Sequence, residues 1–85
     1  MVNLTINKIS KFWIDDQNLY HRLNAPAFEY HSGQKYWYQH GKLHRLDGPA
    51  KNYSNLDKSW YYQGQIINCS SQEEFERWLK LRLLW

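Results

Sequence analysis

Aromatic and β-branched residues are concentrated in two runs in the middle of the chain. The runs at residues 35–45 (KYWYQHGKLHR) and 58–68 (KSWYYQGQIIN) are each interrupted by a short polar turn that contains glycine. This pattern is typical of a β-hairpin. Nearer the N-terminus, Val2, Leu4 and Ile6 alternate with polar residues, which predicts an edge strand within residues 1–11.

The pattern changes to helical spacing at residues 70–85 (SSQEEFERWLKLRLLW). Ser71 and Glu74 form a capping-box signature, acidic residues occupy the first turn, and basic residues lie near the end. The apolar residues Phe75, Trp78, Leu79 and Trp85 share one broad arc of a helix. This segment therefore predicts a terminal helix that caps the open end of the strands.

The strand-forming part repeats every 23 residues. HRLNAPA at residues 21–27 and HRLDGPA at residues 44–50 share five of seven letters. At the same offset, without a gap, Ile14, Trp37 and Trp60 align, and so do Asn18, Gly41 and Gly64. The last three are predicted to occupy left-handed turn positions. A fixed period of this length indicates repeated supersecondary units that stack to bury their apolar faces.

The predicted fold class is therefore α+β, an antiparallel β-meander of about three repeated hairpins with one C-terminal α-helix. Residues 1–85 form a single domain, in which the hairpin units cover residues 12–35, 36–58 and 59–69 and the helix covers residues 70–85. A chain of 85 residues is too short for a separate cofactor domain.

The second turn of each unit contains proline. Asn24 and Asp47 are predicted to form Asx turns by accepting hydrogen bonds from the following backbone. Because Ala25 replaces Gly48, this position does not require a positive φ. We call this second turn, with the His-Arg pair that begins it, the His-Arg corner. The third unit lacks it, since Ile67 stands where His44 would be repeated.

The single cysteine, Cys69, excludes an internal disulfide framework and leaves too few thiols for a structural zinc site. No signal-peptide pattern is present, and no apolar run approaches the roughly 20 residues that span a bilayer. The expected location is therefore the cytoplasm, with no membrane partner.

The net charge of +3 comes from the middle of the chain, residues 31–68. Histidines His31, His40 and His44 would add to this charge on protonation. A positive charge that is concentrated in one segment favours a polyanionic partner.

Two roles, one catalytic and one structural, are possible for the pairs His21-Arg22 and His44-Arg45. A histidine beside an arginine suits acid–base catalysis, whereas a repeated pair suits a structural role in which each histidine bonds its own corner and each arginine covers a ring. Repetition favours the structural role, so no catalytic residue is predicted. No metal site is expected because a turn separates His40 from His44, and no cofactor is expected because the chain has no glycine-rich phosphate loop.

Rings and cations are interleaved along residues 35–62, a pattern that favours RNA binding. Phosphate contacts are assigned to Lys35, Lys42, Arg45, Lys51 and Lys58, and base stacking to Tyr38, Tyr61 and Tyr62. The cationic side chains are expected along one shared strip outside the sheet. The alternative is that every ring belongs to the core and the lysines only keep the sheet soluble.

The segments WYQHGKLHRLDGPA, WYYQGQI and SQEEFERWLKLRLLW resemble small bacteriophage proteins built from His-Arg-x-Asp-Gly-Pro-Ala hairpin repeats, which are loosely akin to MORN-type repeats. The resemblance covers about residues 12–85, and the first unit departs from it with Asn24-Ala25 and with Ile14 in place of tryptophan. It implies a non-enzymatic anti-defence protein in the cytoplasm of the infected bacterial host. Such a protein binds RNA and inhibits a host ribonuclease toxin of a toxin–antitoxin system.

Two other functions stay open from the sequence. The chain could inhibit another host defence protein through its aromatic sheet or its terminal helix. It could also sequester a nucleotide signal in a pocket at a hairpin or subunit junction. The apolar end of the terminal helix is expected to dock on the sheet and to contribute to a homo-oligomer.

Overall fold

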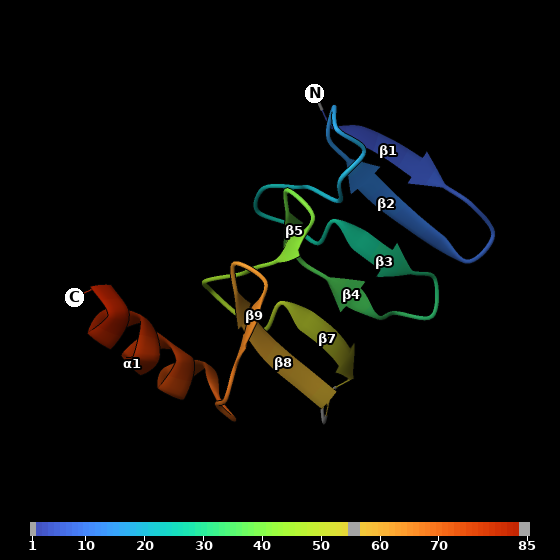
Figure 1. The fold of residues 1–85 in the computed structure, drawn as a ribbon. Coiled ribbons are helices and arrows are strands. Elements are labelled where there is room, and N and C mark those ends of the chain that lie inside the picture. The colour runs from blue at the N-terminus through green and yellow to red at the C-terminus, as the bar shows by residue number, and fades with distance from the viewer. Residues whose placement is uncertain (1, 55–56, 84–85) are drawn as a thin grey trace.

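The structure is a computed structural model, and it describes residues 2–54 and 57–83. These residues have the predicted α+β architecture, an antiparallel meander of short strands followed by one helix (Figure 1). One sheet has the spatial order β1-β2-β3-β4-β7-β8-β9, and each neighbouring pair is antiparallel. Its strands are β1 (Asn3–Ile6), β2 (Ser10–Ile14), β3 (Phe28–Tyr30), β4 (Lys35–Tyr36), β7 (Lys51–Ser54), β8 (Asp57–Tyr62) and β9 (Gln65–Ile67).

Strands β5 (Tyr38–Gln39) and β6 (Lys42–Leu43) form a separate two-stranded sheet. The turn between them is His40–Gly41, with φ values of 48° and 81°. The turn between β8 and β9 is Gln63–Gly64, with φ values of 48° and 86°. Two successive residues with positive φ define the type I′ turn that suits a two-residue hairpin. The left-handed conformation predicted for the two glycines is confirmed.

The first hairpin is one residue longer than the second. Asn18 has the predicted positive φ of 63°, but it is the last of three turn residues, which are closed by a hydrogen bond from the N–H of Asp15 to the carbonyl of Leu19. A three-residue turn that ends in a left-handed residue is the next commonest hairpin connection. The gap-free alignment of Ile14 with Trp37 is therefore wrong, because Trp13 is the structural equivalent of Trp37.

The arginines of the two corners show this equivalence. The guanidinium carbon of Arg22 lies 3.7 Å from the ring centroid of Trp13, and that of Arg45 lies 3.8 Å from the ring centroid of Trp37. Each guanidinium also donates a hydrogen bond to the carbonyl of the proline four residues later, at 3.2 and 3.3 Å. The prediction that arginine covers a neighbouring ring is confirmed, and the contact is a cation–π interaction.

The two corner histidines connect one unit to the next. Nδ1 of His21 accepts a hydrogen bond from the backbone N–H of His40 at 3.0 Å, and Nδ1 of His44 accepts one from the N–H of Gln63 at 2.9 Å. In both cases the donor is the first residue of the following type I′ turn. The prediction that each histidine bonds its own corner is therefore wrong, because the neighbouring unit brings an otherwise unpaired N–H within reach of the ring.

The Asx turn predicted at Asp47 is also replaced by a different contact. Its carboxylate accepts a hydrogen bond from Nε of Arg45 at 2.9 Å. The residue two positions later is Pro49, which has no N–H to donate. Asn24 adopts a positive φ of 62°, so the two corners differ in backbone conformation. Gly48 does not have a positive φ, as predicted.

The helix α1 (Gln72–Leu83) packs against the end of the sheet and forms the largest buried cluster with it (Figure 1). Phe75 is fully buried and meets Trp60 and Ile67, which are each 6% exposed. The indole N–H of Trp60 donates a hydrogen bond to the side chain of Gln72 at 2.8 Å. The helix therefore caps the sheet where the third unit has no His-Arg corner.

The helix begins two residues later than the predicted range of 70–85. The hydroxyl of Ser71 accepts a hydrogen bond from the N–H of Glu74 at 3.2 Å, and the carboxylate of Glu74 accepts one from the N–H of Ser70 at 3.1 Å. Ser71 therefore caps the helix as the capping box predicts, whereas Glu74 reaches back to Ser70 rather than to Ser71. Trp85, which was assigned to the apolar arc, lies outside the described residues. Within those residues, no helix is long and apolar enough to cross a membrane.

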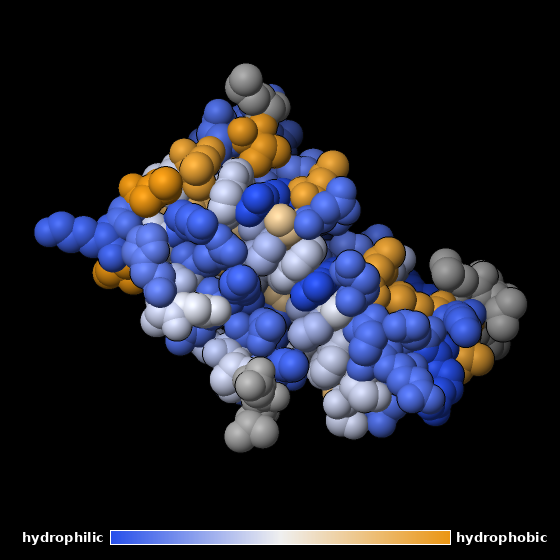
Figure 2. Space-filling model, turned by 180° about the vertical axis from the view of Figure 1, so that it is seen from behind, coloured by the Kyte–Doolittle hydropathy of each residue, from blue (hydrophilic) through white to orange (hydrophobic). Residues whose placement is uncertain are grey.

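Within residues 2–54 and 57–83, no such cap covers the opposite end of the sheet. The predicted edge strand is β1, which ends at Ile6, before β2 begins at Ser10. All four residues of β1 are exposed. Apolar side chains gather at this end of the molecule (Figure 2). The exposed fractions of Leu4, Ile6 and Ile9 are 49%, 63% and 67%.

Candidate functional site

The strand register divides the cations that the sequence assigned to RNA between two faces of the sheet. Lys35 on β4 lies opposite Asn52, and Asn52 lies opposite Lys58. The next residue of β4, Tyr36, lies opposite Lys51. Because paired residues share a face and successive residues of a strand alternate, Lys51 points away from the face that carries Lys35 and Lys58. The expected shared strip is therefore not formed.

One face, which we call the polar face, carries a row of charged and polar residues across successive strands. The row consists of Lys11, Glu29, Lys35, Asn52 and Lys58. The carboxylate of Glu29 lies 3.3 Å from the amine of Lys11 and 4.0 Å from that of Lys35, so it balances part of the positive charge. Two residues further along β2 and β8, the same face presents Trp13 and Trp60.

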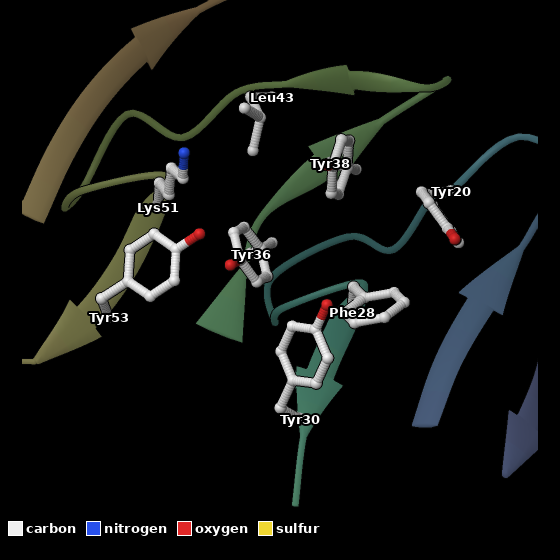
Figure 3. A pocket seen from close by; sticks show the side chains of 8 residues that line it. All are labelled: Tyr20, Phe28, Tyr30, Tyr36, Tyr38, Leu43, Lys51 and Tyr53. Atoms are coloured by element: carbon white, nitrogen blue, oxygen red, sulfur yellow. The ribbon is translucent and has the colours of Figure 1, made fainter. Parts of the chain in front are cut away.

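The other face carries a hollow lined almost entirely by aromatic rings (Figure 3). Its volume is about 300 Å³. We call it the tyrosine hollow, and its lining residues are Tyr20, Phe28, Tyr30, Tyr36, Tyr38, Leu43, Lys51 and Tyr53. These residues come from β3, β4, β5, β6 and β7 and from the segment after β2, so the hollow is assembled from two hairpin units.

The rings of the hollow support one another edge to face. The centroid of Tyr36 lies 5.5 Å from that of Tyr53 and 6.0 Å from that of Tyr30, with interplanar angles of 85° and 69°. Tyr36 is only 9% exposed, whereas Tyr30 and Tyr53 on either side are 37% and 42% exposed. The hydroxyl oxygen of Tyr53 points toward Tyr36, and that of Tyr30 lies beside Phe28 (Figure 3). Two rings are therefore available to a ligand, and a third holds them in position.

Ionisation of the buried hydroxyls is disfavoured. Burial, followed by a hydrogen bond with the Tyr53 side chain, raises the pKa of Tyr36. Burial also raises the pKa of Tyr38. These phenols are therefore neutral at physiological pH, so they offer hydrogen-bonding groups and π faces but no negative charge. The amine of Lys51, which lies 5.2 Å from the ring centroid of Tyr53, is the charged group of the hollow.

The structure places the other predicted RNA contacts differently. Tyr61 lies on the same face as the hollow, because it is two residues along β8 from Ser59, the residue opposite Lys51. The ring of Tyr62 packs on the helix, with its centroid 5.6 Å from that of Trp78. Arg45 is held by Trp37, Asp47 and a carbonyl, as described above. Tyr62 and Arg45 therefore have structural roles, although their contact with RNA stays a prediction.

One group of side chains could be considered for a metal ion. Single ligand atoms of Asp15, His21 and His40 lie within 4.8 Å of one another. However, Nδ1 of His21 accepts the N–H of His40, so the proton of its neutral ring must be on Nε2. His21 therefore has no lone pair left for a metal while it maintains this bond, and the chemistry of the group does not fit a resident cation.

Cys69 is half-buried against the helix cluster. Burial is the main cause that raises the pKa of its thiol, and the nearby Glu74 carboxylate adds to the effect. A thiol with a raised pKa is a weak nucleophile at neutral pH. Cys69 is therefore suited to packing.

Four rings that line the tyrosine hollow were not predicted from the sequence to belong to a site, and these are Tyr20, Phe28, Tyr30 and Tyr53. The spacing of Phe28 with Tyr30, and of Tyr36 with Tyr38, places each pair on one side of a strand. This signal was visible in the sequence, but it does not show that the two pairs meet. The pairing of Phe28 with Tyr36 across β3 and β4 brings them together.

Comparison of the chain with protein-family models, with curated proteins and with solved structures finds no match.

Proposed function

We propose that the chain is a non-enzymatic bacteriophage protein that binds RNA and inhibits a host ribonuclease toxin of a toxin–antitoxin system, in the cytoplasm of the infected bacterium. The observation that carries the RNA-binding part is the tyrosine hollow with its lysine. The inhibitory part rests on the resemblance to hairpin-repeat phage proteins, among them the toxin-inhibitory factor of T-even bacteriophages.

The tyrosine hollow has the features of a platform for unpaired bases. Proteins that bind single strands combine aromatic rings, on which bases stack, with cations that contact the backbone. Tyr30 and Tyr53 present accessible rings, and Lys51 supplies a cation beside them. The helix α1 does not cover this face, because its buried contacts are with Trp60 and Ile67 at the end of the sheet.

Two variants of the hollow test this function. Tyr53→Ala removes an exposed ring, and Lys51→Gln removes the adjacent charge. One lost stack is worth about 1–3 kcal/mol, so Tyr53→Ala should weaken binding of a short single-stranded RNA by roughly 5-fold to 160-fold. Lys51→Gln should lower the slope of log K against log salt by about 0.7, the value for one phosphate contact in a single strand.

Lys35→Gln and Lys58→Gln are the matched controls, because both lysines lie on the polar face. They should retain RNA affinity within about twofold, because their side chains point away from the tyrosine hollow. Titrations followed by fluorescence anisotropy measure the four affinities, and circular dichroism checks the fold. Loss of binding in the polar-face variants with full binding in the hollow variants would contradict the assignment of the hollow.

The inhibitory part has its own assay. A purified ribonuclease toxin is incubated with its RNA substrate and with the wild-type chain or a hollow variant. If inhibition depends on RNA binding, Tyr53→Ala should lose both together. Inhibition that persists after RNA binding is lost would favour the second candidate function, direct inhibition of a host protein.

The exposed apolar end at β1 favours that second candidate. Leu4, Ile6 and Ile9 are exposed apolar side chains that a protein partner could cover. Ionic strength distinguishes the two functions. RNA binding weakens steeply as salt rises because counterions are released, whereas an apolar protein interface changes little.

A further inference from the structure

The tight turns of the repeat are flanked by two hollows that are built in the same way. The first turn hollow lies between the first and second hairpins, has a volume of about 330 Å³, and is lined by Val2, Asp15, Asp16, Gln17, His21 and His40. The second turn hollow lies between the second and third hairpins, has a volume of about 250 Å³, and is lined by Gln39, His40, Lys42, His44 and Gln63.

The two hollows are related by the repeat. Each contains one corner histidine, the turn that precedes it in the chain, and the turn of the next unit. In the first turn hollow His21 accepts the N–H of His40, and in the second His44 accepts the N–H of Gln63. In both hollows a histidine therefore accepts the first N–H of the next turn, although the turn that precedes the histidine is one residue longer in the first hairpin than in the second.

The side chains give the two hollows opposite charge. The first turn hollow contains the carboxylates of Asp15 and Asp16. The lining of the second turn hollow contains no carboxylate and includes Lys42. His40 lies between the hollows, and its Nδ1 is 3.2 Å from a carboxylate oxygen of Asp15. The charge that distinguishes the second turn hollow is therefore that of Lys42.

The remaining side chains of the second turn hollow can donate hydrogen bonds. Because Nδ1 of His44 accepts the N–H of Gln63, the proton of the neutral ring is on Nε2, which is a donor. Gln39 and Gln63 each carry a carboxamide NH₂. Gln39 also lies directly opposite Lys42 in the β5–β6 pair, so both side chains are on the same side of that hairpin.

We infer that the second turn hollow binds a phosphate group, with the amine of Lys42, Nε2–H of His44 and the carboxamides of Gln39 and Gln63 as its contacts. A cation with several neutral donors and no carboxylate matches a small oxyanion. The first turn hollow has the same histidine-to-turn contact but is lined by Asp15 and Asp16, so it should reject the same group. The identification of the phosphate as one of RNA rests on the proposed function.

The position of the hollow fits such a phosphate. Tyr38 and Leu43 are paired in the β5–β6 hairpin and line the tyrosine hollow, whereas Gln39 and Lys42 are paired next to them and line the second turn hollow. Adjacent residue pairs of a hairpin face opposite ways. A strand of RNA that crosses this hairpin would therefore have bases on one side and a phosphate on the other.

Inorganic pyrophosphate is the probe for the site itself. It is titrated into ¹⁵N-labelled protein at neutral pH, and the backbone N–H of Gln63 and the ring nitrogens of His44 report on the second turn hollow. Their signals should shift with saturation, while those of Asp16 and Gln17 in the first turn hollow stay unchanged. Lys42→Gln should raise the dissociation constant by roughly threefold or more, and Lys42→Glu by a larger factor.

Lys80→Gln is the matched control, because Lys80 is an exposed residue of the helix far along the chain from the hollow. It should leave pyrophosphate binding unchanged. The inference is overturned if the signals of His44 and Gln63 do not shift. It is also overturned if Lys42→Gln binds pyrophosphate as tightly as Lys80→Gln and the wild type do.

Measurement of RNA binding with the same variants separates this inference from the proposed function. If the phosphate belongs to RNA, Lys42→Gln lowers the salt slope of RNA binding by about 0.7. If Lys42→Gln loses pyrophosphate but keeps the RNA slope, the phosphate site stands and its ligand is a free phosphate compound. If Tyr53→Ala keeps full RNA affinity while pyrophosphate still binds, the proposed function of the tyrosine hollow fails and the phosphate site stands.

Discussion

His21 and His44 each use one ring nitrogen to accept a backbone N–H from a turn 19 residues later. An imidazole that accepts through Nδ1 must be neutral, since both nitrogens of the protonated ring are donors. His21 is buried at 9% exposure. Burial lowers the pKa of His44 from its ordinary value of 6.5. The two histidines therefore connect the repeat units only while they are uncharged.

Stability should consequently fall in mild acid. The folded protein lowers the pKa of His44, so the contribution of this residue is fully present above pH 6.5 and is lost as the pH falls through the folded value. His44→Phe removes the acceptor and should cost about 1 kcal/mol near neutral pH. It should also reduce the stability difference between about pH 8 and about pH 5. Urea unfolding at both pH values measures this, and an unchanged pH dependence in His44→Phe would contradict the role.

At the scale of elements, the helix α1 packs on the sheet mainly through one side chain, Phe75. Phe75 is the fully buried large side chain of the described residues, and it lies 6.1 Å from Trp78, ring centroid to ring centroid. The helix begins with a capping box and has acidic residues in its first turn and basic residues in its last turn. Because a short helix is marginal alone in water, its order depends on docking to Trp60 and Ile67.

Phe75→Ala should therefore destabilise the protein by about 3–5 kcal/mol, the usual cost of truncating a buried phenylalanine. Release of the helix would expose Trp60 and Trp78, so tryptophan emission should shift to longer wavelength. Leu81→Ala is the matched control, because Leu81 is 60% exposed on the same helix. A loss of equal size in Leu81→Ala would show that helix propensity, rather than docking, controls the effect.

At the scale of the whole molecule, the hairpin units are arranged in a row, and the two ends of the row differ in how far they are covered. The described residues span 40 × 29 × 17 Å, so the protein is flat and elongated. The C-terminal end is covered by α1, whereas β1 at the other end has only β2 beside it and four exposed residues. In a repeat protein, stability depends on contacts with neighbouring units, so an uncapped end opens first.

Hydrogen exchange should show this gradient. Amides of β1 should exchange fastest among the strands. Slow exchange is expected for the N–H of Trp37, which bonds to the carbonyl of buried Ala50 at 2.7 Å, and for the N–H of Ala27, which bonds to the carbonyl of Tyr36 at 2.9 Å. Mass spectrometry of deuterated peptides measures this order. Protection of β1 equal to that of β7 would indicate that another chain covers the edge.

The pattern of the chain predicted the class of fold and the positions of the tight turns because these depend on local chemistry. Gly41 and Gly64 are needed where two successive residues have positive φ, and Ser71 with Glu74 is a local signal for the start of a helix. The one-residue difference in length between the first and second hairpins could not be predicted from the sequence in the same way. Ile14 could be aligned with Trp37 without a gap, and only the stacking of Arg22 on Trp13 shows which residue occupies the equivalent place.

The sequence by itself determined that this protein is a row of similar hairpins with aromatic strands, His-Arg corners and a helix at the end. Only the tertiary structure decided which side chains share a surface. Lys35 and Lys51 look alike in the sequence, but the pairing of β4 with β7 places them on opposite faces, and the rings of two units close into one hollow. The physical reason is that a side chain's face depends on strand register, and register is set by hydrogen bonds between segments that are distant in the chain.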